Sequence, residues 1–299
     1  MGKSVGAALL VSMMFGSILV ARAGQAQSQD QGQKPAQGTA GSQQAGAAGQ
    51  PAQAAPAPPS PDQIKAFNAI QSELDPARQV QLVDDFAKKY PTSSLLSDAY
   101  FFGAYASQQQ GKVPEVIDYG TKSLQANPNN LRSLLTLATM LPQPQDLQGS
   151  DADKEKKLTD AEADANKALE LIPTLKQPPN QTPEQFDQVK ASLASQVHAS
   201  LGMVHLQRAM EGLTGADPAE LAKAEQEYKA AVTGTKQPNP EDYFRLGEVY
   251  ENEKKIDEAI DAFSQASKLG QGTPIQTYAD QQVDKLKKAK AQAPPPAKP

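Results

Sequence analysis

The stretch 243–268, which reads YFRLGEVYENEKKIDEAIDAFSQASK, constrains the fold more than any other part of this 299-residue chain. Four of its residues recur at three- and four-residue spacing and therefore share one face of a predicted helix: Tyr243, Leu246, Gly247 and Tyr250. A glycine inside a helix costs about 1 kcal/mol relative to alanine. Gly247 therefore needs a packing reason, and the close approach of a second helix supplies one.

A second apolar stripe follows in the same stretch and consists of Ala259, Phe263 and Ala266. The small alanines allow two helices to come close, and Phe263 fills the space between them. The two stripes together resemble the tetratricopeptide repeat, a helix–turn–helix unit of about 34 residues, although Gln271 stands where that repeat usually ends in proline. An ordinary helical hairpin is the simpler alternative. Because one unit cannot bury its own apolar face, the resemblance implies neighbouring units.

The chain before residue 240 contains partial copies of the same pattern. In one of them Tyr100 and Gly103 begin a helix, and Gly120 stands at the place of the aromatic residue. Two polar insertions, 142–156 and 174–185, lengthen later copies relative to the repeat. The resemblance thus implies an all-α fold, a right-handed α-solenoid of helical hairpins, with approximate units at 61–96, 97–130, 131–175, 184–238 and 240–273 and a capping helix at 274–290.

The first 60 residues are expected to lie outside this solenoid. Lys3 precedes an apolar run from Val5 to Ala21, and 21–23 reads Ala-Arg-Ala, which predicts a cleaved signal peptide at 1–23 and a periplasmic or secreted protein of a bacterial cell envelope. An uncleaved membrane anchor is the alternative. Segment 24–60 is rich in Gln, Ala and Pro and is interpreted as a disordered linker, and 291–299 as a similar tail.

Composition excludes several kinds of site. The chain has no cysteine, so it has no disulfide, no thiolate zinc site and no cysteine nucleophile. A net charge of −5 disfavours nucleic-acid binding, which normally needs a basic surface. Membrane contact is expected only if the N-terminal segment is retained.

No residue pattern predicts a catalytic site, a metal site or a cofactor. His198 and His205 are seven residues apart on one side of a predicted helix, where core packing is the favoured interpretation over metal binding. The acidic run 151–164 is explained by the preference of carboxylates for a helix N-terminus. Four lysines near the C-terminus (Lys285, Lys287, Lys288 and Lys290) are interpreted as a solvated face, with an anionic membrane surface as the alternative.

The resemblance also implies a binding surface. In this family the first helices of successive units line a concave groove that holds extended peptides or partner segments. The corresponding positions here are Phe101, Tyr105, Gln108, Arg132, Leu135, Thr139, Gln196, Met203, Phe244, Glu248 and Glu251. The alternative for Phe101 and Tyr105 is packing against the preceding helices. The subfamily that grips carboxylate termini has Lys and Asn where Phe101 and Tyr105 stand, so that ligand is not expected.

The sequence therefore predicts an exported, non-enzymatic scaffold that binds an unidentified protein or peptide. A membrane-tethered envelope assembly factor is the first alternative. The second is an enzyme or small-ligand binder that uses the insertions 142–156 and 174–185, for which no convergent set of titratable residues is visible.

Overall fold

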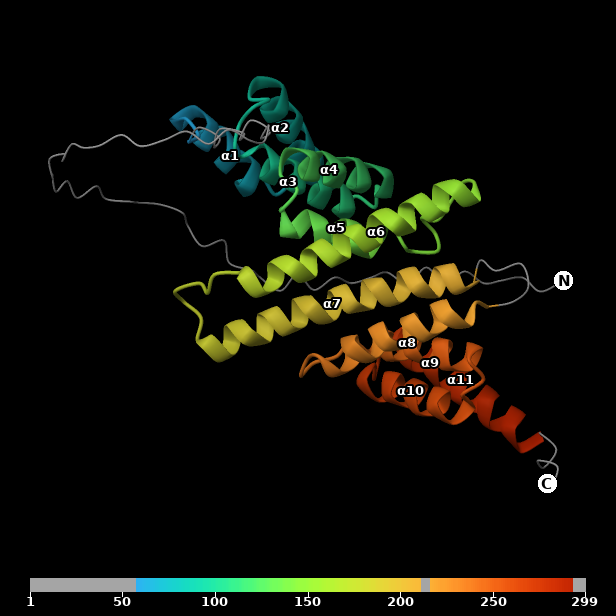
Figure 1. Ribbon diagram of the computed structural model, residues 1–299. Coiled ribbons are helices and arrows are strands. Elements are labelled where there is room, and N and C mark those ends of the chain that lie inside the picture. The colour runs from blue at the N-terminus through green and yellow to red at the C-terminus, as the bar shows by residue number, and fades with distance from the viewer. Residues whose placement is uncertain (1–57, 211–215, 293–299) are drawn as a thin grey trace, which may run out of the picture. The chain divides into compact units, whose positions relative to one another are not determined.

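The structure is a computed structural model that describes residues 58–210 and 216–292 (Figure 1). These residues form α-helices and one short 3₁₀ helix, with no strand among them. The elements are α1 (Pro61–Ser72), α2 (Pro76–Lys89), α3 (Leu96–Gln109), α4 (Val113–Ala126), α5 (Leu131–Met140), α6 (Asp151–Leu171), η1 (Ile172–Thr174), α7 (Pro183–Met210), α8 (Pro218–Thr233), α9 (Pro240–Asn252), α10 (Ile256–Leu269) and α11 (Pro274–Gln292). The predicted signal peptide, nearly all of the predicted linker and most of the C-terminal tail lie outside the described residues.

Several helices begin at a short polar residue followed by proline. Asp75, Asp217 and Asn239 each accept a hydrogen bond from a backbone N–H of the first helical turn, and proline follows each of them. Proline suits this position because its missing N–H would have no partner within the helix. Local sequence therefore fixes where α2, α8 and α9 start.

The helices pack in chain order as antiparallel pairs. The pairs are α1/α2, α3/α4, α5/α6, α7/α8 and α9/α10, and α11 covers α10. The second helix of each pair also packs against the first helix of the next pair, and first helices touch one another, as α5 touches α7 and α7 touches α9. This arrangement confirms the predicted all-α solenoid of helical hairpins.

A glycine opposite an aromatic ring closes three of these hairpins. A Cβ atom added to Gly247 would lie 2.8 Å from the ring of Phe263, and one added to Gly202 would lie 2.8 Å from the ring of Tyr228. Real Cβ contacts are longer, so alanine at either position would force the two helices apart. The packing reason expected for Gly247 is therefore present in the structure.

The α3/α4 hairpin obtains its ring from an unexpected residue. Gly120, at the place of the aromatic in the repeat, instead packs against Leu137 of α5, with 2.9 Å between an added Cβ and the leucine side chain. The preceding residue, Tyr119, packs on Gly103, at 2.9 Å by the same measure. A shift of one residue in α4 thus keeps the glycine–ring contact and adds a close contact to the next unit.

The two insertions lengthen helices as well as connections. Helix α6 has 21 residues and α7 has 28, and the two lie side by side (Figure 1). The connection before α6 is held by Leu147, which is 8% exposed and packs beside Leu158, and by Lys157 Nζ, which donates to the carbonyl of Asp146 at 2.7 Å. This connection is thus tied to the fold by its own contacts.

Two large apolar clusters lie at opposite ends of the series of pairs. We call the cluster of α1–α4 the N-terminal core; its buried members are Phe67, Ile70, Val83, Phe86, Ala99, Ala104, Val116 and Tyr119. We call the cluster of α7–α11 the C-terminal core; it includes Leu206, Tyr228, Phe244, Val249, Phe263, Ile275 and Leu286.

Candidate partner-binding face

The residues predicted to line a groove come from α3, α5, α7 and α9, and we call their common surface the first-helix face. The structure buries four of the eleven to between 5% and 9% exposure: Phe101, Leu135, Met203 and Phe244. Tyr105 is exposed, at 39%. The other six are half-buried: Gln108, Arg132, Thr139, Gln196, Glu248 and Glu251.

Helices α3 and α5 meet through a stacked arginine. The guanidinium of Arg132 lies 4.4 Å from the ring centre of Phe101, and its Nη2 lies 2.7 Å from Asp98 Oδ1. Both charged side chains are more than a third exposed, so the ion pair itself contributes little to stability. The stack instead holds the guanidinium in one orientation at the surface. Tyr105 follows Phe101 one helical turn later on α3.

Helices α5 and α7 meet through hydroxyl and amide groups. Thr139 Oγ1 donates to the carbonyl of Leu135 at 2.8 Å and lies 3.2 Å from Ser200 Oγ. Gln196 Nε2 donates to Thr139 Oγ1 at 3.4 Å. The structure therefore brings Thr139 and Gln196 together, and their contacts join successive units.

Helix α9 carries the acidic end of the first-helix face. Glu248 accepts a hydrogen bond from Arg245 Nη1 at 2.8 Å, and Glu251 accepts one from Lys285 Nζ of α11 at 2.7 Å. Asp242, on the same helix, is 8% exposed. Burial and the neighbouring charge of Glu241 raise the pKa of Asp242 to about 7, although Arg245 opposes this.

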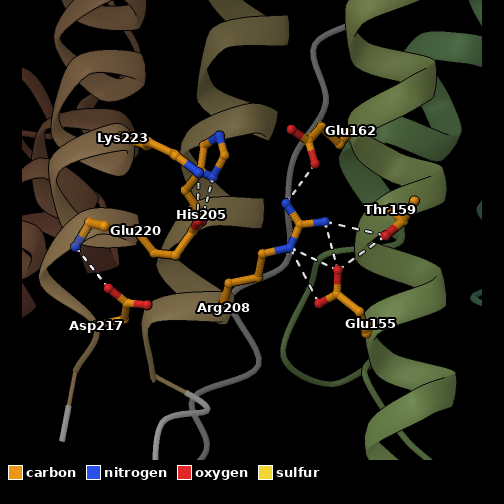
Figure 2. Close-up of polar contacts among 9 residues, drawn as sticks. Glu155, Thr159, Glu162, His205, Arg208, Asp217, Glu220 and Lys223 are labelled. Carbon is orange, nitrogen blue, oxygen red and sulfur yellow. Dashed lines mark hydrogen bonds and ion pairs between the residues drawn. The ribbon is translucent and has the colours of Figure 1, made fainter.

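His205 is buried, at 7% exposure, and both histidines also make polar contacts that were not predicted from the sequence. His198 Nδ1 lies 2.7 Å from Glu227 Oε2, and His205 Nδ1 lies 2.7 Å from Glu220 Oε2 (Figure 2 shows the second pair). Both glutamates belong to α8, so the two contacts join α7 to α8. The sequence does contain a signal for these two pairs, because the two histidines are seven residues apart and the two glutamates are also seven residues apart.

Arg208 forms a second polar junction that the sequence analysis did not identify. Its Nε donates to Glu155 Oε1 at 3.1 Å and its Nη1 donates to Glu162 Oε2 at 2.5 Å. Figure 2 shows that Arg208 points from α7 toward α6, whereas His205 points toward α8. The acidic run 151–164 thus does more than favour a helix start, because it holds α7 against α6.

A pocket of about 740 Å³ lies between the start of α7 and the end of α8. Its lining includes Glu184, Asp187, Thr235 and Lys236. Glu184 falls in the insertion 174–185, where a small-ligand site is one alternative. Within the ranges 58–210 and 216–292, no group of three or more metal-ligating side chains is placed to hold a metal ion.

No protein-family model matches the chain, and no curated protein shows significant similarity to it. Several solved structures match the chain at low sequence identity, and two are described here. The assembly chaperone of RpL4 (Acl4, residues 1–338) has 10% identity and a TM-score of 0.56, over 77% of this chain and 85% of that one. TTC0263, a thermophilic TPR protein of Thermus thermophilus, has 15% identity and a TM-score of 0.47, over 74% of this chain and 97% of that one.

The likeness to Acl4 concerns the fold alone, since the identity is low. Together with the glycine–ring hairpins described above, it supports the all-α solenoid of helical hairpins expected from the sequence. None of the helices in the described part of the chain is both long enough and apolar enough to cross a membrane.

Proposed function

We propose that this chain is a non-enzymatic interaction scaffold that binds a protein or peptide along the first-helix face. The observation that carries this proposal is the continuity of that face. Arg132 of α5 contacts Phe101 and Asp98 of α3, α5 contacts α7, and α7 contacts α9, so one extended partner segment can contact several units at once. Such a preformed surface binds with little ordering cost on the side of the scaffold.

The burial pattern indicates which residues a partner would contact. Phe101, Leu135 and Phe244 support the surface from within, because they are nearly inaccessible. Tyr105 and the half-buried Arg132 are accessible, and tyrosine and arginine are the residue types that most often dominate binding energy at interfaces. We therefore place the strongest contact at the α3/α5 end of the face. Acl4, described as an assembly chaperone of RpL4, is one protein of similar fold whose description implies a protein partner.

We further propose that the protein is exported. The proposal depends on Lys3, the apolar run from Val5 to Ala21 and the small residues Ala21 and Ala23. The intact mass of the protein recovered from the cells that make it provides the test. A chain that begins near Gly24 supports export with cleavage, whereas a chain that keeps residues 1–23 favours the membrane-tethered assembly factor.

The scaffold proposal is tested by affinity capture with the full chain as bait. The variant Tyr105→Ala truncates the exposed ring on α3. The matched control Leu269→Ala truncates a similarly exposed side chain, at 45%, on α10, which is a second helix. We expect Tyr105→Ala to reduce recovery of the partner about tenfold, the loss typical of a moderate interface hot spot, and Leu269→Ala to change it less than twofold.

Both variants must keep the melting temperature and helicity of the parent chain for this comparison to hold. Equal recovery with Tyr105→Ala and the parent chain would contradict the proposed location of the site. A catalytic turnover or a small-ligand thermal shift that is lost on mutation of Glu184 and Asp187 would favour the pocket at the start of α7 instead.

A further inference from the structure

Two donors converge on one oxygen of Asp98, which lies in the first turn of α3. Arg132 Nη2 of α5 donates to Asp98 Oδ1 at 2.7 Å, and Asn130 Nδ2 donates to the same oxygen at 3.1 Å. Among the described residues, none donates a hydrogen bond to the second oxygen, Oδ2. The Asp98 side chain is 42% exposed, so the carboxylate keeps one oxygen available as an acceptor at the surface.

The carboxylate is held in place by a buried polar network. Asn130 is 6% exposed, its Oδ1 accepts from the backbone N–H of Ser133 at 3.3 Å, and its Nδ2 also donates to Ser97 Oγ at 2.9 Å. Ser97 Oγ in turn donates to the carbonyl of Ser123 on α4 at 2.9 Å. The amide of Asn130 therefore has one orientation that satisfies all its partners, and this fixes which oxygen of Asp98 is occupied.

Arg132 supplies donors beside this free acceptor. Its guanidinium lies 4.4 Å from the ring centre of Phe101, and the contact with Asp98 uses only one of the five N–H groups that a guanidinium carries. The Arg132 side chain is 38% exposed. Asp98, Phe101 and Tyr105 follow one another at helical spacing and share one side of α3. The surface thus offers an acceptor and several donors side by side, on the same side of α3 as the exposed ring of Tyr105.

Asp98 and Arg132, which we call the Asp98/Arg132 pair, have no net charge together, and this decides which group fits them. An acidic side chain would be attracted by the guanidinium but repelled by the carboxylate beside it, and a basic side chain would meet the opposite balance. An apolar group would cover polar atoms without replacing their hydrogen bonds to water. A backbone amide is uncharged and provides both an N–H for Oδ2 and a C=O for the guanidinium.

We propose that the Asp98/Arg132 pair binds the backbone of an extended partner segment through the N–H and C=O groups of one residue. In an extended chain these two groups point to the same side, so they can reach an acceptor and a donor that are adjacent. Tyr105 then contacts a side chain of the same segment. This inference rests on the proposed function, since it names the chemistry by which the α3/α5 end of the first-helix face holds its partner.

The test uses an uncharged capped pentapeptide, acetyl-Thr-Val-Thr-Val-Thr N-methylamide, whose residues favour an extended backbone. It is titrated into the full chain and followed by the NMR signals of the backbone amides and of the arginine Nε–H groups. We expect saturable shifts at Asp98, Tyr105 and Arg132. The absence of shifts at these residues would overturn the proposal.

Two variants distinguish an amide ligand from a charged one. In Asp98→Asn the new amide must turn its oxygen toward the donors Asn130 and Arg132, so its NH₂ group takes the place of Oδ2 and offers a donor instead of an acceptor. Arg132→Met removes the donors. We expect each variant to weaken pentapeptide binding about fivefold, which corresponds to the loss of one hydrogen bond. An acidic ligand would bind Asp98→Asn more tightly and a basic ligand would bind Arg132→Met more tightly, so a gain in either variant would overturn the proposal.

A matched control uses an ion pair on a second helix. Lys167 and Glu170 of α6 lie 2.9 Å apart and are 42% and 67% exposed, and Lys167→Met/Glu170→Gln should change pentapeptide binding less than about twofold. A depsipeptide in which esters replace the backbone N–H groups tests the contact with the protein unchanged, whatever the variants do to stability. It should lose the shifts at Asp98, and their persistence would overturn the proposal.

Three small probes test other kinds of ligand at constant ionic strength. Acetate represents an acidic side chain, methylammonium a basic one, and propionamide the carboxamide of glutamine, which the pentapeptide does not contain. We expect all three to shift the signals of Asp98 and Arg132 less than the pentapeptide does at equal concentration. A larger shift with any of them would show that the pair recognises that side-chain group and would overturn backbone binding.

The outcome for this inference can be told apart from that for the scaffold proposal. If Asp98→Asn captures the natural partner as well as the parent chain does, while Tyr105→Ala loses it, the scaffold stands and backbone binding by the Asp98/Arg132 pair is wrong. If the pentapeptide binds as expected but Tyr105→Ala captures the partner normally, the amide-binding pair stands and the proposed contact at Tyr105 is wrong.

Discussion

The two ends of the solenoid form similar helical hairpins but hold them together differently. In the N-terminal core the pairs α1/α2 and α3/α4 meet through rings: Phe67 lies 6.2 Å from Phe86 and 5.9 Å from Phe102 between ring centres. Glycine–ring contacts occur in both cores, but in the C-terminal core ion pairs join one helical pair to the next. Lys255 of the α9–α10 turn lies 2.6 Å from Glu225 of α8, and Lys285 of α11 lies 2.7 Å from Glu251 of α9.

This difference shows that the repeat pattern specifies how closely the two helices of one hairpin pack. It does not specify which contacts join one hairpin to the next. Ring contacts depend on apolar burial, which salt and pH change little between neutral and mildly acidic conditions. Ion pairs and buried carboxylates respond to both. The C-terminal core should therefore be the part of the molecule that solution conditions alter first.

The largest expected effect is local loss of stability in Phe263→Ala. The ring of Phe263 is 0% exposed and packs on Gly247, so its removal leaves a cavity and should cost about 3–5 kcal/mol. Because each hairpin contacts mainly its neighbours, we expect amide hydrogen exchange to accelerate in α8–α10 and to stay near its original rate in α3 and α4.

The matched variant Phe86→Ala should do the reverse. Phe86 is 3% exposed in the N-terminal core, and its loss should accelerate exchange in α2 and α3 while α9 and α10 keep their protection. If either variant accelerated exchange equally at both ends, the two cores would be one cooperative unit and the comparison would fail.

A second effect is expected from the pH dependence that Asp242 confers on the C-terminal core. Burial raises the folded-state pKa of this carboxyl to about 7, above its unfolded value of about 3.9. Its contribution is thus fully present below pH 4 and is lost as the pH rises through 7. Asp242→Asn should flatten the fall in α9 and α10 stability between pH 4 and pH 8.

Urea unfolding followed by hydrogen exchange at several pH values provides the measurement for Asp242. The control Asp284→Asn changes an exposed carboxylate on α11 and should leave the pH slope of α9 and α10 as it is in the parent chain. A slope in Asp242→Asn equal to that of the parent chain would show that another group causes the dependence.

The smallest expected effect is that of single surface ion pairs. Lys285→Ala removes the contact with Glu251, and since the Lys285 side chain is 62% exposed the loss should be at most about 0.5 kcal/mol and should vanish in 0.5 M salt. Arg132→Lys at the other end keeps the charge but loses the planar stack on Phe101, so its effect should persist in salt. Thermal unfolding at 0.05 M and 0.5 M salt distinguishes the two.

Short-range patterns in the sequence predicted the helices and the solenoid because they depend on residues close in the chain. The spacing of Gly247 and Phe263 is one example, since both the glycine and the ring belong to a single hairpin. The ring of the α3/α4 hairpin comes from Tyr119 rather than from the place held by Gly120, and a repeat pattern with fixed positions does not anticipate a shift of one residue.

The candidate site was less accessible to prediction because it depends on how units pack on one another. The burial of Leu135, Met203 and Phe244 is set by neighbouring helices rather than by their own. The contacts of His205 with Glu220 and of Arg208 with Glu162 depend on how α6, α7 and α8 are rotated about their axes relative to one another. This relative rotation depends on the lengthened connections between the helices, and the repeat pattern does not predict the conformation of those connections.

Site-specific photocrosslinking at residue 105 tests the central claim most directly. The side chain of Tyr105 is replaced by benzoylphenylalanine in the full chain, and the same replacement at Leu269 on α10 serves as the control. The account predicts that irradiation in the producing cells joins one protein to position 105 and not to position 269. A crosslink at 269 with none at 105, or none at either position, would contradict binding along the first-helix face.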